Sequence, residues 1–127
     1  MRGNEHVTAQ LEPLMITCII RYHIDPNKKA EFEQYARNWG QAIPRCGADL
    51  IGYFAPHEGS ATLAYGVYHV ESLAAYEAYR ARLAEDAAAR ENFAFAQAER
   101  FIRCEDRAFF KLVSPPHAAL VRPGTPG

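Results

Sequence analysis

Aromatic side chains are the most suggestive chemical feature of this sequence. Seven tyrosines, seven phenylalanines and one tryptophan make up 12% of the chain. Rings that carry a few hydroxyl groups are suited to bind an apolar or aromatic small molecule, and the small residues Ala64 and Gly66 leave room beside them. The candidate pocket residues are Tyr22, Trp39, Tyr68, Phe93 and Phe95. The alternative interpretation is that these rings simply fill the core.

Motifs for nucleophilic catalysis, phosphate binding and zinc hydrolysis are absent from the sequence. His57 is the candidate acid or base, because a loop histidine beside a carboxylate, here Glu58, can transfer protons. A solvated turn is the alternative for this pair. His23 and His69 each end a predicted strand, but a tight metal site needs a third ligand, and none is evident. We therefore predict neither a metal nor a cofactor, and the catalytic residues stay unknown.

The composition is that of one ordinary globular domain. Of 127 residues, 49% are hydrophobic and 23% are charged. The net charge of -1 argues against nucleic acid as a partner. Three cysteines without a CxxC pair, the lack of a signal peptide and the lack of a membrane-length apolar run together predict a cytoplasmic protein without membrane contact.

Composition also divides the chain into three parts. Residues 1–13 are polar and unpatterned, which predicts a flexible N-terminal arm, and Met15 is an alternative translation start. Residues 114–127 carry four of the eight prolines, which predicts an extended Pro-rich C-terminal tail. One folded domain is predicted between them, over residues 15–113.

The periodicity of this domain predicts a strand, a helix, two strands, two helices and a last strand. N-caps are expected at Asp25, Ser72 and Asp86, because their side chains can accept a hydrogen bond from the first turn of a helix. Strands are predicted at 15–24, 49–55, 62–70 and 106–113, and helices from 26 to Pro44, from Leu73 onward and at 87–103.

An internal repeat supports this order. The segments 22–24 and 68–70, Tyr-His-Ile and Tyr-His-Val, each precede an acidic residue and a helix with an aromatic-Glu-x-Tyr motif. Two such halves predict an α+β, ferredoxin-like split βαβ fold with a four-stranded antiparallel sheet. Within that sheet, the repeat predicts that its own two strands lie side by side, run in parallel and bring His23 next to His69.

The predicted sheet has two apolar faces. The side with Ile16, Ile20 and Ile24 should face the helices. The opposite side carries Ile19, Leu63, Tyr65 and Val67. An apolar patch of this kind typically marks an interface, so we predict a homodimer that packs sheet face to sheet face.

The core resembles the NIPSNAP family of the dimeric α+β barrel superfamily. The segments that carry the resemblance are IIRYHIDPNKKAEFEQYARNW, IPRCGADLIGYFAPHEGS, SLAAYEAYRARL and NFAFAQAERFI. The resemblance implies a ferredoxin-like subunit and a barrel formed by two sheets across a dimer. The family pattern places an arginine two residues before the tyrosine of the first strand, where this chain has Ile20, so no role is carried over for that arginine.

Two classes of function remain open. One is a homodimer that binds a small apolar or aromatic molecule between sheet and helices. The resemblance extends this class to a cofactor-independent monooxygenase acting on a phenolic or enolic compound, because such enzymes occur in the superfamily. The alternative is a non-catalytic dimeric binding or interaction module, since fold alone does not decide function.

Overall fold

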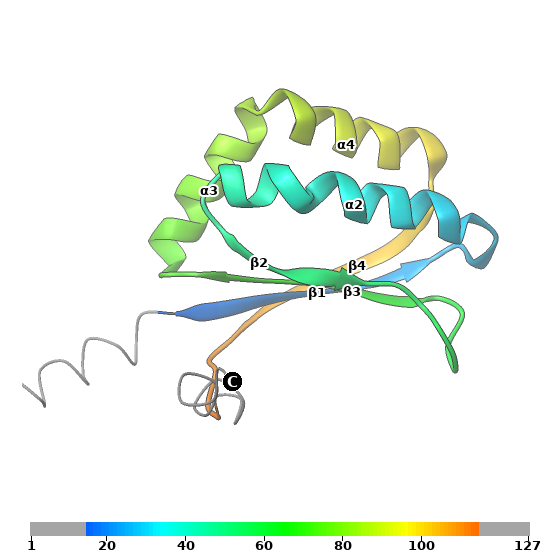
Figure 1. Ribbon diagram of the computed structural model, residues 1–127, viewed down its shortest axis with the longest axis horizontal. Coiled ribbons are helices and arrows are strands. Elements are labelled where there is room, and N and C mark those ends of the chain that lie inside the picture. The colour runs from blue at the N-terminus through cyan, green and yellow to red at the C-terminus, as the bar shows by residue number, and fades with distance from the viewer. Residues whose placement is uncertain (1–14, 115–127) are drawn as a thin grey trace, which may run out of the picture.

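Residues 15–114, the part of the chain that this computed structural model describes, form strands and helices in the order β-α-β-β-α-α-β. The strands are β1 (Ile16–Ile24), β2 (Asp49–Phe54), β3 (Leu63–Val70) and β4 (Ile102–Phe110). The helices are α2 (Lys29–Arg45), α3 (Leu73–Glu85) and α4 (Ala87–Glu99), and a 3₁₀ turn, η2 (Pro26–Lys28), leads into α2. All the helices lie on one face of the sheet (Figure 1), so the ferredoxin-like α+β prediction is confirmed.

The predicted arm, residues 1–13, and the predicted tail beyond Ser114 lie outside the described residues. None of the helices within 15–114 is long and apolar enough to cross a membrane.

The predicted N-caps are confirmed. The side chains of Asp25, Ser72 and Asp86 each accept a hydrogen bond from a backbone N–H two or three residues further on, at 2.9–3.0 Å. Asp86 also accepts two hydrogen bonds from the Arg45 guanidinium, at 3.0 and 2.8 Å. These bonds to Arg45 hold the pKa of the Asp86 carboxyl below its ordinary value. The pair joins the end of α2 to the start of α4.

The sheet order is β2-β3-β1-β4, and every neighbouring pair is antiparallel. The predicted parallel pairing of β1 with β3 is therefore wrong. The helix α2 returns the chain so that β2 has the same direction as β1, and the turn after β2 reverses the chain, so β3 lies between them and runs antiparallel to both. In this register His23 lies opposite Leu63 and His69 lies opposite Thr17, so the two histidines are at opposite ends of the strands.

The last helix ends earlier than predicted. α4 stops at Glu99, and the chain is extended again from Ile102, within the predicted helix 87–103. Arg100 takes the left-handed conformation with φ 58°, which terminates the helix. Phe101 then turns into the core, where it is fully buried. The spacing of Phe101 from the aromatic residues of α4 matches one face of a helix, which explains why the predicted helix extended to residue 103.

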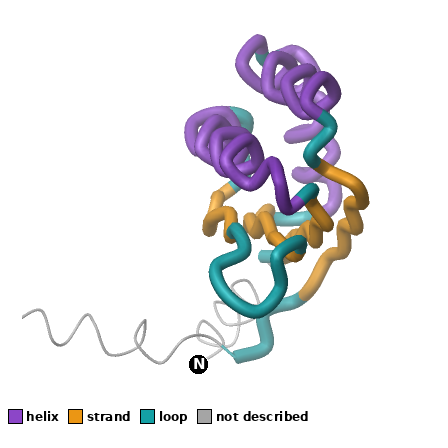
Figure 2. The backbone as a smooth tube through the Cα atoms, turned by 90° about the vertical axis from the view of Figure 1, so that its right-hand side faces the viewer, coloured by secondary structure: helices purple, strands orange, loops and turns teal. Residues whose placement is uncertain are grey.

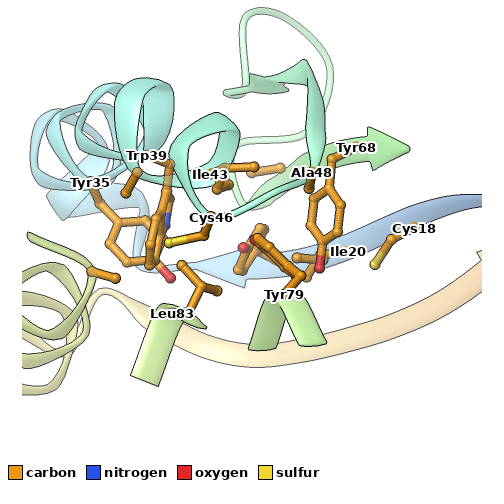
Figure 3. Close-up of a cluster of buried hydrophobic side chains, with 14 of the residues drawn as sticks. Cys18, Ile20, Tyr35, Trp39, Ile43, Cys46, Ala48, Tyr68, Tyr79 and Leu83 are labelled. Atoms are coloured by element: carbon orange, nitrogen blue, oxygen red, sulfur yellow. The ribbon is translucent and has the colours of Figure 1, made fainter. Parts of the chain in front are cut away.

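The core lies between the helices and the face of the sheet that they cover, and Figure 3 shows part of it. Alternate residues of β1 from Cys18 to Ile24 are buried, as predicted for the side that faces the helices. The buried Asn92 amide of α4 donates to the Tyr35 carbonyl at 3.0 Å and accepts from Asn38 at 2.8 Å, which fastens α4 to α2. The buried residues of α2 are Phe32, Tyr35, Trp39, Ala42 and Ile43.

The space above Gly66 is filled. Tyr53 of β2 lies opposite Gly66 in the sheet, and its ring covers the glycine so closely that an added Cβ would come within 2.7 Å of it. The Tyr53 hydroxyl reaches the Tyr22 hydroxyl, with the two oxygens 3.2 Å apart. The expected room beside Gly66 is thus occupied by a tyrosine that the sequence interpretation left out.

Within residues 15–114, no helix covers the other face of the sheet (Figure 2). The register places Phe54 opposite Tyr65 and Phe110 opposite Thr17 on this side. The Phe54 and Phe110 side chains are 52% and 49% exposed. The partly buried residues at the middle of this face are Ile19, Leu63, Tyr65 and Val67. We call this surface the open sheet face.

Candidate functional site

A surface groove beside α4 adjoins a small cavity between the sheet and the helices. The groove has a volume of about 450 Å³, within the usual range of small-molecule sites. The cavity has about 30 Å³, which is room for about two water molecules. Tyr35, Phe93 and Glu105 line both spaces, so the cavity lies directly behind the groove. The other groove residues are Ala96, Gln97, Arg100 and Ile102.

Four of the five predicted pocket residues, Tyr22, Trp39, Tyr68 and Phe93, line this cavity together. Trp39 is 2% exposed and packs edge-on against Phe93, with ring centroids 5.0 Å apart. Trp39 also packs edge-on against the Tyr35 ring, with centroids 5.6 Å apart. The tryptophan therefore sits between the groove wall and the cavity.

Phe95 and His57 lie elsewhere. Phe95 packs against Phe101, with ring centroids 5.3 Å apart, and lines a separate shallow groove beside Asn38 and Asn92. His57 lines another surface groove around the turn between β2 and β3. Neither residue lines the aromatic cavity.

The remaining histidines of the described part make ordinary hydrogen-bonding contacts. His69 Nδ1 lies 2.9 Å from the Thr17 hydroxyl, and His23 Nδ1 lies 3.5 Å from the Thr62 hydroxyl. Residues 15–114 hold no cluster of three or more side chains of the types that ligate metals.

The tyrosine hydroxyls around the cavity keep their protons. Burial raises the pKa of Tyr22 and of Tyr53 well above the ordinary value, and it also raises the pKa of Tyr68 and Tyr79, whose rings pack 5.2 Å apart (Figure 3). These hydroxyls are therefore neutral at physiological pH. They can donate or accept hydrogen bonds, but they do not act as bases.

Two residues of the site were missed by the sequence interpretation, Glu105 and Arg107 of β4. They lie opposite Tyr22 and Ile20, on the side of the sheet that faces the helices, and both line the cavity. The Arg107 Nη2 donates to a Glu105 carboxylate oxygen at 2.9 Å. Burial lowers the pKa of Arg107, but its surroundings, which include the Glu105 carboxylate, outweigh this effect and raise the pKa, so the guanidinium stays charged.

The sequence contained one indication of these two residues, which is their spacing along the strand. Residues two apart in a strand share one side of the sheet, so 105, 107 and 109 point together. Phe109 packs against Tyr76 of α3, with ring centroids 4.8 Å apart, which identifies that side as the helix side.

Two buried hydrogen-bond donors at the cavity have no partner within the described residues. They are the indole Nε1 of Trp39 and the Nε of Arg107. Burial raises the pKa of Tyr35 and the neighbouring Trp39 offsets part of that rise, but the indole N–H forms no hydrogen bond within residues 15–114. Buried donors are rarely left unpaired, so both atoms identify this cavity as a candidate binding site.

Comparison with known proteins now decides the family. The NIPSNAP family model matches residues 17–115. The chain belongs to the NIPSNAP family. An uncharacterised NIPSNAP-like domain protein from Burkholderia xenovorans is 25% identical, and the alignment covers 80% of this chain and 90% of that chain with a TM-score of 0.64. A NIPSNAP family protein of unknown function from Agrobacterium tumefaciens is 17% identical, with coverage of 82% and 93% and a TM-score of 0.70.

The fold of this NIPSNAP protein also occurs outside the family. A protein from Nitrosomonas europaea, provisionally named an antibiotic biosynthesis monooxygenase, is 13% identical, with coverage of 80% and 92% and a TM-score of 0.59. A likeness at this identity supports the fold alone. The comparison with curated proteins gives no match.

Proposed function

We propose that this NIPSNAP protein binds a small aromatic molecule in the groove beside α4, with one end in the cavity behind it. The observation that carries the proposal is the shared wall of the two spaces, formed by Tyr35, Phe93 and Glu105. The groove supplies the volume that the cavity lacks. Phe93 is 40% exposed at this wall, so its ring is available to stack on a ligand that enters from solvent.

The residues at the site favour binding over an oxygenase reaction. A substrate that reacts directly with oxygen must first lose a proton to a base. The cavity tyrosines hold their protons, because burial raises their pKa values. The Glu105 carboxylate is already held by Arg107. His57, the candidate base from the sequence, lies in a different groove. The proposal is therefore a small-molecule-binding protein, which is the first of the two classes that the sequence left open, without the oxygenase reaction.

Trp39 provides a direct measurement of binding, because it is the single tryptophan of the chain. Menadione, a neutral aromatic quinone that quenches tryptophan fluorescence, should quench Trp39 saturably, with a dissociation constant in the micromolar range. Replacing Ala96 in the groove wall by phenylalanine should weaken the affinity by about tenfold, because the added ring occupies the ligand space.

The control is Ala94→Phe, because Ala94 is exposed on the same helix and does not line the groove. This variant should bind menadione like the wild type. Quenching that rises linearly without saturation, or that is equal in both variants and the wild type, would contradict a site in the groove.

We further propose that the open sheet face joins two copies of this chain. Its central residues Ile19 and Val67 lie opposite each other on adjacent strands, and Phe54 and Phe110 extend the apolar surface to both edges of the sheet. On the same face, Arg21 and Asp106 form an ion pair at 3.6 Å. Their opposite charges cancel, so this pair adds no net charge to the face. An exposed apolar sheet surface of this kind suits the interface of a two-fold symmetric dimer.

Native mass spectrometry at micromolar concentration tests the dimer. The wild type should appear at twice the 14.2 kDa chain mass. Val67→Glu should appear at the chain mass, because it places a charge at the centre of the interface. Leu73→Glu, an exposed position on α3, should remain dimeric. A monomeric wild type would refute this part of the proposal.

A further inference from the structure

We propose that the aromatic ligand of this site carries a carboxylate, and that the carboxylate accepts hydrogen bonds from Trp39 Nε1 and Arg107 Nε. The inference rests on the proposed function, because it names the chemical class of the molecule in the same groove. Both donor atoms are buried without a partner in the described part of the chain, and both side chains line the same cavity. A ligand that supplies acceptor oxygens there would satisfy both.

The charge around the site favours an anion. Arg107 and Arg80 line the cavity and Arg100 lines the groove, and the only carboxylate that lines either space is Glu105. Arg80 is held in place by its stacking on the Tyr76 ring and by a hydrogen bond of 3.0 Å to the Tyr76 hydroxyl. Glu105 accepts a hydrogen bond from the Nη2 of Arg107, and the Nε of the same guanidinium has no acceptor among the residues that the structure describes.

The dimensions of the two spaces distinguish the ends of the ligand. The cavity of about 30 Å³ is of the size of two carboxylate oxygens, whereas the ring needs the groove of about 450 Å³. The cavity tyrosines remain protonated, because burial raises their pKa values, so they do not repel an anion. The ligand class is thus an aromatic acid with its carboxylate innermost.

Two probes of nearly equal shape test the inference, 2-naphthoate and its neutral amide, naphthalene-2-carboxamide. Isothermal titration calorimetry of the full chain should find the acid binding about tenfold more tightly than the amide, because hydrogen bonds to charged groups are the stronger ones. In Arg107→Gln this preference should vanish. Trp39→Phe, which keeps a ring and loses the N–H, should weaken both probes.

The matched control is Arg103→Gln, an exposed arginine of the same strand that lines neither space. It should keep the preference for the acid. Equal affinity of acid and amide in the wild type would overturn the carboxylate and leave the proposed aromatic site standing, and this comparison needs no variant to fold. A preference that persists in Arg107→Gln would overturn the role of Arg107. Failure of menadione and of both naphthyl probes to bind would instead reject the proposed function itself.

Discussion

Replacing Phe32 by alanine is expected to lower the free energy of unfolding by about 3–5 kcal/mol, the usual cost of deleting a buried aromatic ring. Phe32 is fully buried, and its ring lies at the centre of an aromatic cluster. The centroid of that ring lies 5.3 Å from that of Tyr22 and 6.3 Å from those of Tyr53 and Phe101. The mutation therefore leaves a cavity that touches α2, β1, β2 and the start of β4, and tight packing gives little scope for collapse.

Urea denaturation followed by circular dichroism measures this loss. Wild type and variant must be compared at the same protein concentration, because association stabilises the folded state. Leu73→Ala is the control, since Leu73 is 58% exposed on α3 and its truncation should change the free energy of unfolding by less than about 0.5 kcal/mol. A similarly small loss for Phe32→Ala would mean that the aromatic cluster does not hold the helices to the sheet.

Replacing Gly66 by alanine is expected to destabilise the protein by about 1–3 kcal/mol, the range for overpacking a dense core. Where space is available, the same exchange in a strand interior usually stabilises, because alanine restricts the unfolded chain more than glycine does. Here the new Cβ would lie 2.7 Å from two atoms of the Tyr53 ring. That ring has little freedom to move, because its hydroxyl is bonded to Tyr22 and its face contacts Phe32.

Gly40→Ala supplies the contrast in sign. Gly40 lies in α2, and an added Cβ there would meet no atom within 4 Å. This variant should be more stable than the wild type by up to about 1 kcal/mol, from helix propensity. A double-mutant cycle then isolates the clash. In a Tyr53→Leu background, Gly66→Ala should cost clearly less, whereas an unchanged cost would show that the tyrosine ring is not the obstacle.

The effect of Gly66→Ala should extend to the binding site. Tyr22 and Tyr53 share a hydroxyl contact, and both line the cavity. A shift of the Tyr53 ring would therefore also disturb the cavity in which we place the carboxylate.

Local patterns in the sequence were sufficient for the secondary structure and for much of the cavity. Asp25, Ser72 and Asp86 were identified as helix caps, because capping depends on a side chain and the few residues that follow it. The alternation of β1 correctly predicted its buried side. Tyr22 and Trp39 were assigned to the same space for the same reason, since period and spacing determine which side of a strand or helix a residue occupies.

The sequence did not determine the contacts between elements that are distant along the chain. The direction of β3 relative to β1 depends on how the turns connect the strands. The repeated Tyr-His motif predicted a parallel pair, whereas the two strands are antiparallel. Arg107 was missed because its role depends on which face of an edge strand points to the helices. The room expected beside Gly66 is filled by Tyr53 from a neighbouring strand.

Sequence alone thus determined the α+β order, the caps and the aromatic character of the interior of this NIPSNAP protein, because these follow from local conformational preference and hydrophobic period. Only the tertiary structure brought Arg107 of β4 to the same cavity as Trp39 of α2 and left a donor on each without a partner among residues 15–114. Such a site depends on packing across long sequence separations, where side-chain direction and the satisfaction of hydrogen bonds are properties of the whole fold.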